Sequence, residues 1–545
     1  MLNRSHQSQR GQSAVFTLVL LGAILMGVAL LYNSGRLSLT KTRLQNTADS
    51  AAYSGSVLLA RDYNFSSYAN RGMVANQVAI AQIVGLRSWA QYECYTYNNS
   101  GCGNQGGADP NDLASQIQST VNSSEASGIW GTVLSGYADS SSALNSAVRP
   151  TTAVIVDMAN TIDVALSAAS RVFHLGVVAD LASTAANTGA GIIGEVVQAN
   201  DPQAQISTFG KVTLGADAAA IAGFTKTNAK SGDTQGQNRI APTVLNDLDA
   251  FSESRSASDP PYEADLWNPF AFIPYNDQPY AMIWNSHSGG TEWKNGYTQW
   301  SAMDVSNAYG FSIYWISVFG YPVPLILPIW RIDPPLYLDS TEFALGGATV
   351  GSGRGDPLGQ TNNYGPCGAT APCTAASGWN FNDGTWSNPG NEDQSFGGSY
   401  TANPTPANDE DTRGPGNSFA HYSGLQPYQD VSNTKQSDFD APQITVVLSR
   451  AQSTVHTTSQ IDNGQGKGIF SGALNLADAE PSNQVEAIAS ADAHFERPWS
   501  SAIENNLGVS VVYGNLFNPY WEPHLVPTNP ATKAAAQGAQ FAGQG

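Results

Sequence analysis

The longest uninterrupted apolar run in the chain lies close to the N-terminus. Residues 14–32 read AVFTLVLLGAILMGVALLY and carry no charge. A helix of about 20 apolar residues spans the hydrocarbon core of a bilayer, so this segment is predicted to be a transmembrane helix. A later apolar run, GFSIYWISVFGYPVPLILPIW, is interrupted by Pro322, Pro324 and Pro328, which would leave backbone groups unpaired in lipid. We therefore expect a single membrane span.

A cleavable secretory signal is the competing interpretation of this run. The apolar core of such a signal usually has about 7–15 residues and ends at a small-residue cleavage site. The run here is longer, and the following LLYNSGRL offers no good site. An uncleaved anchor is therefore favoured. Positive charges on the two sides of the run balance, so the positive-inside rule does not orient it.

Helical spacing continues beyond the span. Small and apolar residues recur with that spacing at Leu37, Leu44, Ala48, Ala51, Ala52, Gly55 and Leu59. Small side chains allow a second helix to approach closely. This stripe is either a docking face for a partner subunit or a surface that packs on later helices of the same chain.

The helical pattern extends through residues 68–92 and returns in an Ala-rich region at 112–224. Alternation then predicts strands at 311–319, 443–448 and 485–495. The motif NLFNPYWEPHLVP resembles a closing strand or turn, and the last residues, PATKAAAQGAQFAGQG, are predicted to be a frayed tail.

The expected fold class is α+β, with a transmembrane helix that continues into a long helix, a helical layer, and an antiparallel β-rich domain with a long Gly-rich insertion. The expected order is an N-terminal segment (1–13), the membrane helix (14–32), an extended helical region (33–245), an aromatic β-rich region (246–345), a Gly/Pro/Asn-rich insertion (346–440), a β-rich region (441–530) and a flexible tail (531–545).

Composition changes this picture mainly through charge and cysteine. Charged residues make up 12% of the chain, and 24 basic against 44 acidic side chains give a net charge of −20. Because nucleic-acid binding needs clustered Lys and Arg, and no basic run exists, nucleic acid is not an expected partner.

The four cysteines form two sequence-close couples, Cys94/Cys102 and Cys367/Cys373. In an exported protein, such couples in turn-rich sequence predict two local disulfides. Free thiols or one shared zinc site are the alternatives, although neither couple has the spacing of a zinc knuckle. The cysteines and the Trp/Gly/Pro-rich body favour a large C-terminal part outside the cytoplasm.

Candidate chemistry is sparse. Asp492, His494 and Glu496 alternate along one predicted strand and share a face, which is either a metal or acid–base site or a solvated surface. His174 lies on an apolar helix, where a hydrogen-bonded core histidine is the simpler interpretation than a catalyst. No H-E-x-x-H, phosphate-loop or G-x-S-x-G motif occurs. We expect no enzyme, no cofactor and no metal site, while a triad assembled by the fold stays open.

Aromatic side chains are dense in the middle of the chain. The tryptophans of this region are Trp284, Trp293, Trp300, Trp315 and Trp330. They would stack on sugars in an adhesin, but a buried β core is the default expectation for such residues.

The N-terminal residues carry a family resemblance. The chain shows RGQSAV at residues 10–15, GRL at 35–37 and KTRLQNTADSAA at 41–52, with the uncharged span between the first two. This order resembles the N-terminal module of the TadE/TadG-like proteins of Flp (Tad-type) pilus assembly. The resemblance covers roughly residues 8–60, with its characteristic element at 33–60.

The resemblance implies a non-enzymatic assembly or structural component of a pilus or secretion system. It implies a single-pass inner-membrane protein, with residues 1–13 in the cytoplasm, most of the chain in the periplasm, and other assembly or pseudopilin subunits as partners. Pilins of such systems are cut after a Gly and carry a Glu five positions later, but Gly11 is followed at that position by Phe16. A permanently anchored factor is therefore expected. A surface-exposed minor pilus component or glycan-binding adhesin is the alternative, and an anchored periplasmic hydrolase is a weaker one. The oligomeric state stays open.

Overall fold

The structure is a computed structural model of the 545-residue chain. It describes residues 10–97, 127–187, 189–228, 234–253, 280–294, 297, 299–318, 321–326, 349–350, 422–432, 440–455, 457, 484–496 and 514–542.

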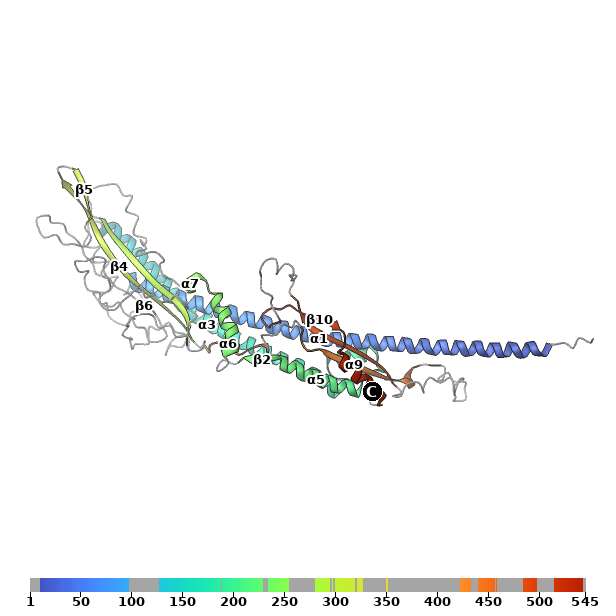
Figure 1. Cartoon of the computed structure of the whole chain (residues 1–545). Helices are drawn as coiled ribbons and strands as arrows, with labels where there is room; N and C mark the ends of the chain where they lie inside the picture. The colour runs from blue at the N-terminus through green and yellow to red at the C-terminus, as the bar shows by residue number, and fades with distance from the viewer. Residues whose placement is uncertain are drawn as a thin grey trace, which may run out of the picture. The chain divides into compact units, whose positions relative to one another are not determined.

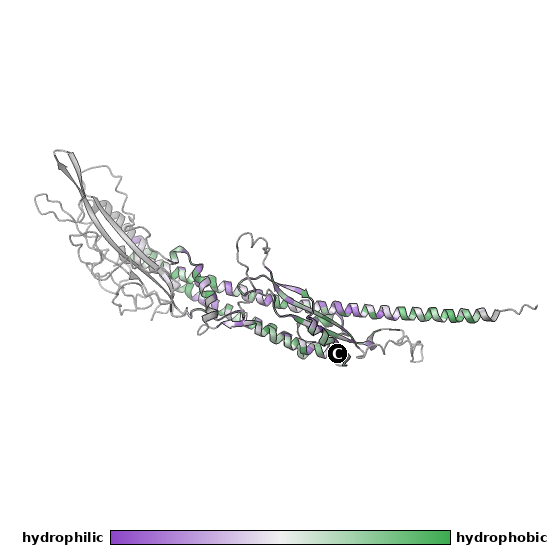
Figure 2. Cartoon of the chain, viewed as in Figure 1, coloured by the Kyte–Doolittle hydropathy of each residue, from purple (hydrophilic) through white to green (hydrophobic). Residues whose placement is uncertain are grey.

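The N-terminal helix α1 (Arg10–Tyr97) is one continuous element of 88 residues. Figure 2 shows its first part as an apolar stretch and the remainder as mixed in hydropathy. Side chains of the predicted span lie on the surface, with Phe16 71% and Leu31 75% exposed. The expected long apolar N-terminal helix is thus confirmed, and it ends five residues beyond the 68–92 pattern.

Among the described residues, two helical stretches are long and apolar enough to cross a membrane. One is Ser13–Arg87 within α1, and the other is the less apolar Asp139–Ala186 within α3 (Ser127–Ala186). The sequence predicted only the first. In α3, Asp163 and His174 are buried and hydrogen-bonded to residues of α1.

The chain divides into two compact units, each built from separate stretches of sequence. Unit 1 contains residues 1–69, 168–227 and 429–545, and unit 2 contains residues 70–167 and 228–428. The serial regions expected from the sequence therefore do not coincide with these units, because α1 and α3 each contribute to both.

Unit 1 is built around an antiparallel sheet. Its strand order is β1 (Gln205–Ile206), β8 (Ile444–Ala451), β9 (Gln484–Phe495) and β10 (Trp521–Val526). Two of its strands fall where alternation placed them, at 443–448 and 485–495, and β10 lies in the predicted closing motif. The alternate residues of β9 are buried, from Val485 to Phe495.

Helices of unit 1 complete its core. These are the first part of α1, the end of α3, α4 (Gly191–Asn200), α5 (Thr208–Phe224) and α9 (Pro530–Phe541). The buried faces of α1, α3, α4 and α5 join those of the strands in one apolar cluster, and Ala536 of α9 is also buried. Figure 1 shows α1 passing the strands of this unit.

Both edges of the sheet are partly capped. On the β8 side, the Thr445 amide donates to the Asp217 carboxylate of α5 at 2.7 Å, and the Ser207 amide donates to the Val447 carbonyl. On the β10 side, the amide group of Asn64 in α1 bonds both the N–H and the C=O of Trp521, at 3.0 and 2.9 Å. Such contacts satisfy edge groups that would otherwise template pairing with another chain.

The helical region expected at 112–224 is interrupted more often than predicted. Gly191 adopts φ 71° after the end of α3, where a Cβ would approach Thr184 Oγ1 to 2.2 Å. Only glycine takes this conformation without strain. The chain then forms α4, the short strand β1 and α5, so a strand is present where the sequence predicted only helix.

The predicted frayed tail is wrong for residues 530–541, which form α9. The Asn529 side chain accepts from the Ala531 amide at 2.9 Å, and Pro530 occupies the first turn. An Asn cap, a Pro in the first turn and several alanines together favour a helix start.

Unit 2 contains the second part of α1, the first part of α3, α6 (Thr234–Asn246), α7 (Ala250–Glu253) and a sheet. The sheet has the order β3 (Tyr280–Lys294), β4 (Gln299–Val318) and β5 (Tyr321–Ile326), with β6 (Thr349–Val350) also paired to β4. The strand expected at 311–319 is part of β4. A separate pair, most of whose residues belong to unit 1, joins β2 (Thr225–Asn228) to β7 (Tyr428–Val431). Most of the predicted 346–440 insertion lies outside the described residues.

Within unit 2, Gln77 of α1 connects α3, β4 and the segment at Tyr422. Its Nε2 donates to Asp163 of α3 at 2.7 Å, and its Oε1 accepts from Trp300 Nε1 at 3.0 Å and from the Tyr422 hydroxyl at 2.7 Å. Asn76 donates to the other oxygen of Asp163. Burial raises the pKa of Asp163 to about 7, although both amide donors act to lower it.

Candidate functional site: the helix-packed N-terminal module

The predicted stripe on α1 lies inside unit 1. All six packing residues of the stripe are buried, namely Leu44, Ala48, Ala51, Ala52, Gly55 and Leu59. The five with side chains belong to the same apolar cluster as strands β8 and β9. In this structure their cover comes from the chain's own later elements, which was one of the two interpretations of the stripe.

Gly55 marks the closest approach along this stripe. A Cβ at this position would lie 3.0 Å from Ile193 Cδ1 of α4 and 3.3 Å from Ile444 Cδ1 of β8. Ten residues earlier, Gln45 donates to the Ile488 carbonyl of β9 at 2.9 Å. The small residues of the stripe thus allow α1 to lie directly against α4 and the sheet.

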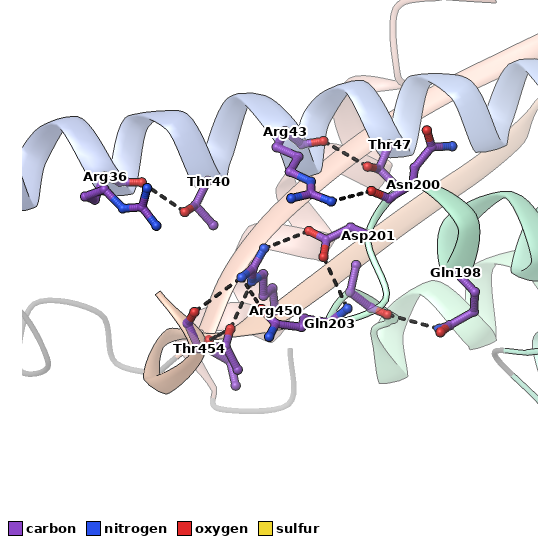
Figure 3. A network of polar contacts seen from close by, with 12 residues as sticks. Arg36, Thr40, Arg43, Thr47, Gln198, Asn200, Asp201, Gln203, Arg450 and Thr454 are labelled. Carbon is purple, nitrogen blue, oxygen red and sulfur yellow. Dashed lines mark hydrogen bonds and ion pairs between the residues drawn. The ribbon is translucent and has the colours of Figure 1, made fainter. Parts of the chain in front are cut away.

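Polar contacts join the same layers at the end nearer the apolar segment (Figure 3). Arg43 of α1 donates to the Asn200 carbonyl at the end of α4, at 2.7 Å. Arg450 of β8 forms a buried ion pair with Asp201 at 2.9 Å and also contacts Gln203 and Thr454. Because both partners of the Arg450–Asp201 pair are nearly inaccessible, removal of either would leave a buried charge unpaired between the turn after α4 and β8.

A buried polar chain crosses unit 1 further along α1. His174 Nδ1 of α3 lies 2.6 Å from Asp62 Oδ2 of α1, and His174 Nε2 lies 2.9 Å from the Thr225 hydroxyl at the start of β2. Burial raises the pKa of Asp62, and the hydrogen bond and charge of His174 act in the opposite direction. The order carboxylate–imidazole–hydroxyl is that of a catalytic triad.

Burial argues for a structural role of this chain of groups. Asp62 is 0%, His174 5% and Thr225 9% exposed, so the hydroxyl does not face a substrate from solvent. His174 is therefore the hydrogen-bonded core histidine that its apolar helix suggested. The sequence did not single out Asp62 or Thr225, and the only available signal was an acidic residue on the buried side of the helical pattern.

The residues Asp492, His494 and Glu496 follow one another along β9 and its end. His494 contacts Asp440, its ring stacks on His524 of β10 at 4.9 Å, and Asp492 is paired in register with His524. Burial first and Asp440 second raise the pKa of Asp492 to about 6, whereas His494 and His524 act to lower it. Among the described residues, no group of three or more His, Cys, Asp or Glu side chains is arranged to hold a metal ion.

The remaining candidate residues are only partly described. Trp293 and Trp300 are 1% and 0% exposed and stack on each other at 4.8 Å, so their faces are occupied within unit 2. Cys94 is buried near the end of α1. The other three cysteines lie outside the described residues, and both disulfide pairings stay predictions.

Unit 1 is therefore a module in which a long, N-terminally apolar helix is itself part of an α+β core. Residues 11–62 match the model of a protein family described as putative Flp pilus-assembly TadE/G-like. This match confirms the recognition of the N-terminal module and supports a pilus-associated role for the chain. It ends at Asp62, so it spans the apolar segment and the buried stripe. No curated protein and no solved structure matches the chain.

Proposed function

We propose that this chain is a non-enzymatic, membrane-anchored assembly or structural component of a Tad-type (Flp) pilus or secretion system. Residues 14–32 cross the inner membrane once, residues 1–13 lie in the cytoplasm, and most of the chain lies in the periplasm. Its partners are other assembly or pseudopilin subunits.

One observation carries this proposal. The exposed apolar segment of α1 continues without a break into the buried stripe of unit 1, and the family match covers both parts. A helix that leaves the membrane and enters the core of an outer domain couples that domain rigidly to the bilayer. This arrangement suits a fixed support for other subunits better than release into a fibre.

A genetic test separates the proposed role from a fibre subunit. In cells that make such pili, deletion of the gene should abolish pili, and the full-length chain should restore them without entering the sheared fibre fraction. Replacement of residues 14–32 by a cleavable signal should release the chain and leave pili absent. Full piliation by the released form would contradict the anchored role, and recovery of the chain in fibres would favour the minor-subunit alternative.

A further inference from the structure

Four titratable side chains gather on one face of the unit 1 sheet. Asp492 and His494 lie two residues apart on β9, and His524 of β10 is paired in register with Asp492. Asp440 forms an isolated antiparallel bridge to His494. Because directly paired residues project their side chains to the same side of a sheet, all four groups share one face. We call these four residues the clasp.

Contacts within the clasp join three stretches of chain. His494 Nδ1 donates to the Asp440 carboxylate, and the ring of His494 stacks on that of His524, with 4.9 Å between ring centroids and 16° between ring planes. Next to the clasp, the Ala441 amide donates to the Ala493 carbonyl at 2.9 Å. The contacts therefore hold the chain that enters β8, and the edge strand β10, to β9, which lies between them.

The clasp is open to solvent on one side and buried on the other. The side chains of Asp440 and His494 are 56% and 28% exposed, whereas Asp492 is only 3% exposed. Asp492 Oδ1 has no hydrogen-bond partner among the described residues. A carboxyl group that is buried without such a partner is favoured in its neutral form. Protons from water therefore reach the clasp, and burial favours their uptake by Asp492.

Carboxylates outnumber the charges that could neutralise them at this face. Within the part of the chain that the structure describes, the charges that shift the pKa of Asp492 are those of the other three clasp residues, and no lysine or arginine of a neighbouring element is among them. Two further carboxylates lie along the same strands, since Glu522 is paired with His494 and Glu496 follows His494 by two positions. While both imidazoles are neutral, this face carries only negative charge, and its carboxylates repel one another.

Proton uptake should strengthen the contacts of the clasp. Histidine is the side chain that ordinarily changes charge between about pH 5 and pH 8. Protonation of His494 turns its hydrogen bond to Asp440 into an ion pair, and a bond between two charged groups is stronger than one from a neutral donor. Protonation of His524 places a positive charge opposite Asp492. The two imidazolium rings repel each other in the stack, but each lies beside a carboxylate that offsets this repulsion.

Asp492 responds to acid in the same direction. Burial first and the charge of Asp440 second raise its pKa to about 6, whereas His494 and His524 act to lower it. Because this pKa lies above the ordinary value of an aspartate, the folded chain binds the proton more tightly than the unfolded chain does. The stability that the proton contributes is present at low pH and is lost as the pH rises through about 6.

We propose that the clasp is an acid-strengthened device, which fastens β10 and the chain that enters β8 to β9 when the surroundings become mildly acidic. At neutral pH the same elements open more readily, because the carboxylates of the clasp repel one another. The device is built from contacts within unit 1 and does not depend on the proposed function. Only its biological use rests on that function, which places unit 1 in the periplasm, where the pH follows that of the medium.

Hydrogen–deuterium exchange of the full-length chain in detergent, at pH 5 and at pH 7.5, tests this proposal. Protection factors, which correct for the intrinsic pH dependence of exchange, are compared for peptides that contain β10 or residues 440–444. A carboxyl group with a pKa of about 6 in the folded chain and about 3.9 in the unfolded chain raises protection about tenfold from pH 7.5 to pH 5. The wild type should therefore gain at least about tenfold protection in these peptides at pH 5.

Two variants separate the clasp from other acidic groups. Asp492→Asn resembles the protonated acid, so it should be at least as protected as the wild type at pH 7.5 and should gain less protection at pH 5. Asp440→Asn removes an exposed carboxylate, and it should lower the gain because His494 loses its ion pair. The double variant should abolish the gain. Glu195→Gln, which removes an exposed carboxylate from α4, is the matched control and should keep the tenfold gain.

Several outcomes would overturn the proposal. Protection that stays constant or falls on acidification would show that the imidazolium rings repel each other more than the carboxylates attract them. A gain that persists in the double variant would assign the pH dependence to other buried carboxylates, such as Asp62 and Asp217. Loss of pili on gene deletion without the pH effect would contradict the clasp alone. The expected pH effect in a chain without any role in piliation would support the clasp and contradict the proposed function alone.

Discussion

Removal of the His174 side chain should destabilise unit 1 strongly. The Asp62 carboxylate is fully buried, its Oδ2 lies 2.6 Å from His174, and its Oδ1 has no hydrogen-bond partner among the described residues. His174→Ala therefore leaves a buried carboxylate with no partner on either oxygen. A buried carboxylate that is charged and has lost its partner costs about 3–5 kcal/mol.

The loss of stability in His174→Ala should depend on pH in a defined direction. Burial raises the pKa of Asp62 in the folded chain, so the folded state binds the proton more tightly than the unfolded state. The stability contributed by this proton is present at low pH and is lost as the pH rises through the folded-state pKa. Without His174 the charged form is still less favourable, so His174→Ala should cost more at pH 8 than at pH 5.

Hydrogen–deuterium exchange of the full chain in detergent measures the effect locally. Peptides of α1 near Asp62 and of α3 near His174 should exchange roughly a hundred- to a thousandfold faster in His174→Ala, since 1.4 kcal/mol corresponds to a factor of ten. The double variant Asp62→Leu/His174→Leu should lie within about 1–2 kcal/mol of the wild type, because an apolar pair leaves no unpaired charge. Val172→Ala, on the exposed face of α3, is the matched control. A stability loss under 1 kcal/mol in His174→Ala would refute this reasoning. So would a double variant whose stability loss equals the sum of the losses in Asp62→Leu and His174→Leu.

Three further predictions follow from other contacts. In unit 2, burial raises the pKa of Asp163 to about 7. The free energy of unfolding of unit 2, monitored by hydrogen exchange, should therefore fall by a few kcal/mol between pH 4 and pH 8. Asp163→Asn should remove most of this pH dependence. Asn64→Ala should lower the free energy of unfolding by about 2 kcal/mol, because both backbone groups of Trp521 lose their partner. Hydrogen exchange should become faster in β10 and α1 only. Unchanged exchange in these elements would contradict the prediction. Asn529→Ala should cost about 1 kcal/mol and fray α9, which would be seen as faster exchange at its N-terminal amides.

Elements with a strong repeat were predictable from the sequence. The apolar segment and the small-residue stripe both lie on one helix, as their spacing predicted, and the alternation from Val485 to Phe495 defines β9. The apolar segment is recognised by its uninterrupted length, whereas in the stripe and in β9 one face of a single element is buried, and the period of that burial is written directly in the sequence.

Features that depend on tertiary contacts were not predictable. The strand β1 is two residues long and exists because Gln205 and Ile206 pair with β8, a contact between residues more than 240 positions apart. The tail helix α9 was not predicted because terminal residues commonly fray, whereas here Asn529 caps the helix.

The contacts of the candidate site were likewise not predictable from the sequence. His174 was visible as a histidine on an apolar helix, but its partners Asp62 and Thr225 come from two other elements. The exposed apolar face of α3 around Val172 and Leu175 was hidden for a different reason. An apolar pattern on a helix indicates which face is suited to contact but not whether this chain supplies the contact.

The central claim is that this chain is a permanent membrane anchor for pilus assembly. The most direct test is mass spectrometry of its N-terminus after fractionation of cells that express a C-terminally tagged chain, with cysteine mapping under non-reducing conditions. The account predicts an unprocessed N-terminus before Gly11 in the inner membrane, with Cys94 linked to Cys102 and Cys367 to Cys373. A new N-terminus at Gln12 with recovery in sheared fibres would contradict it and would make the chain a pilus subunit.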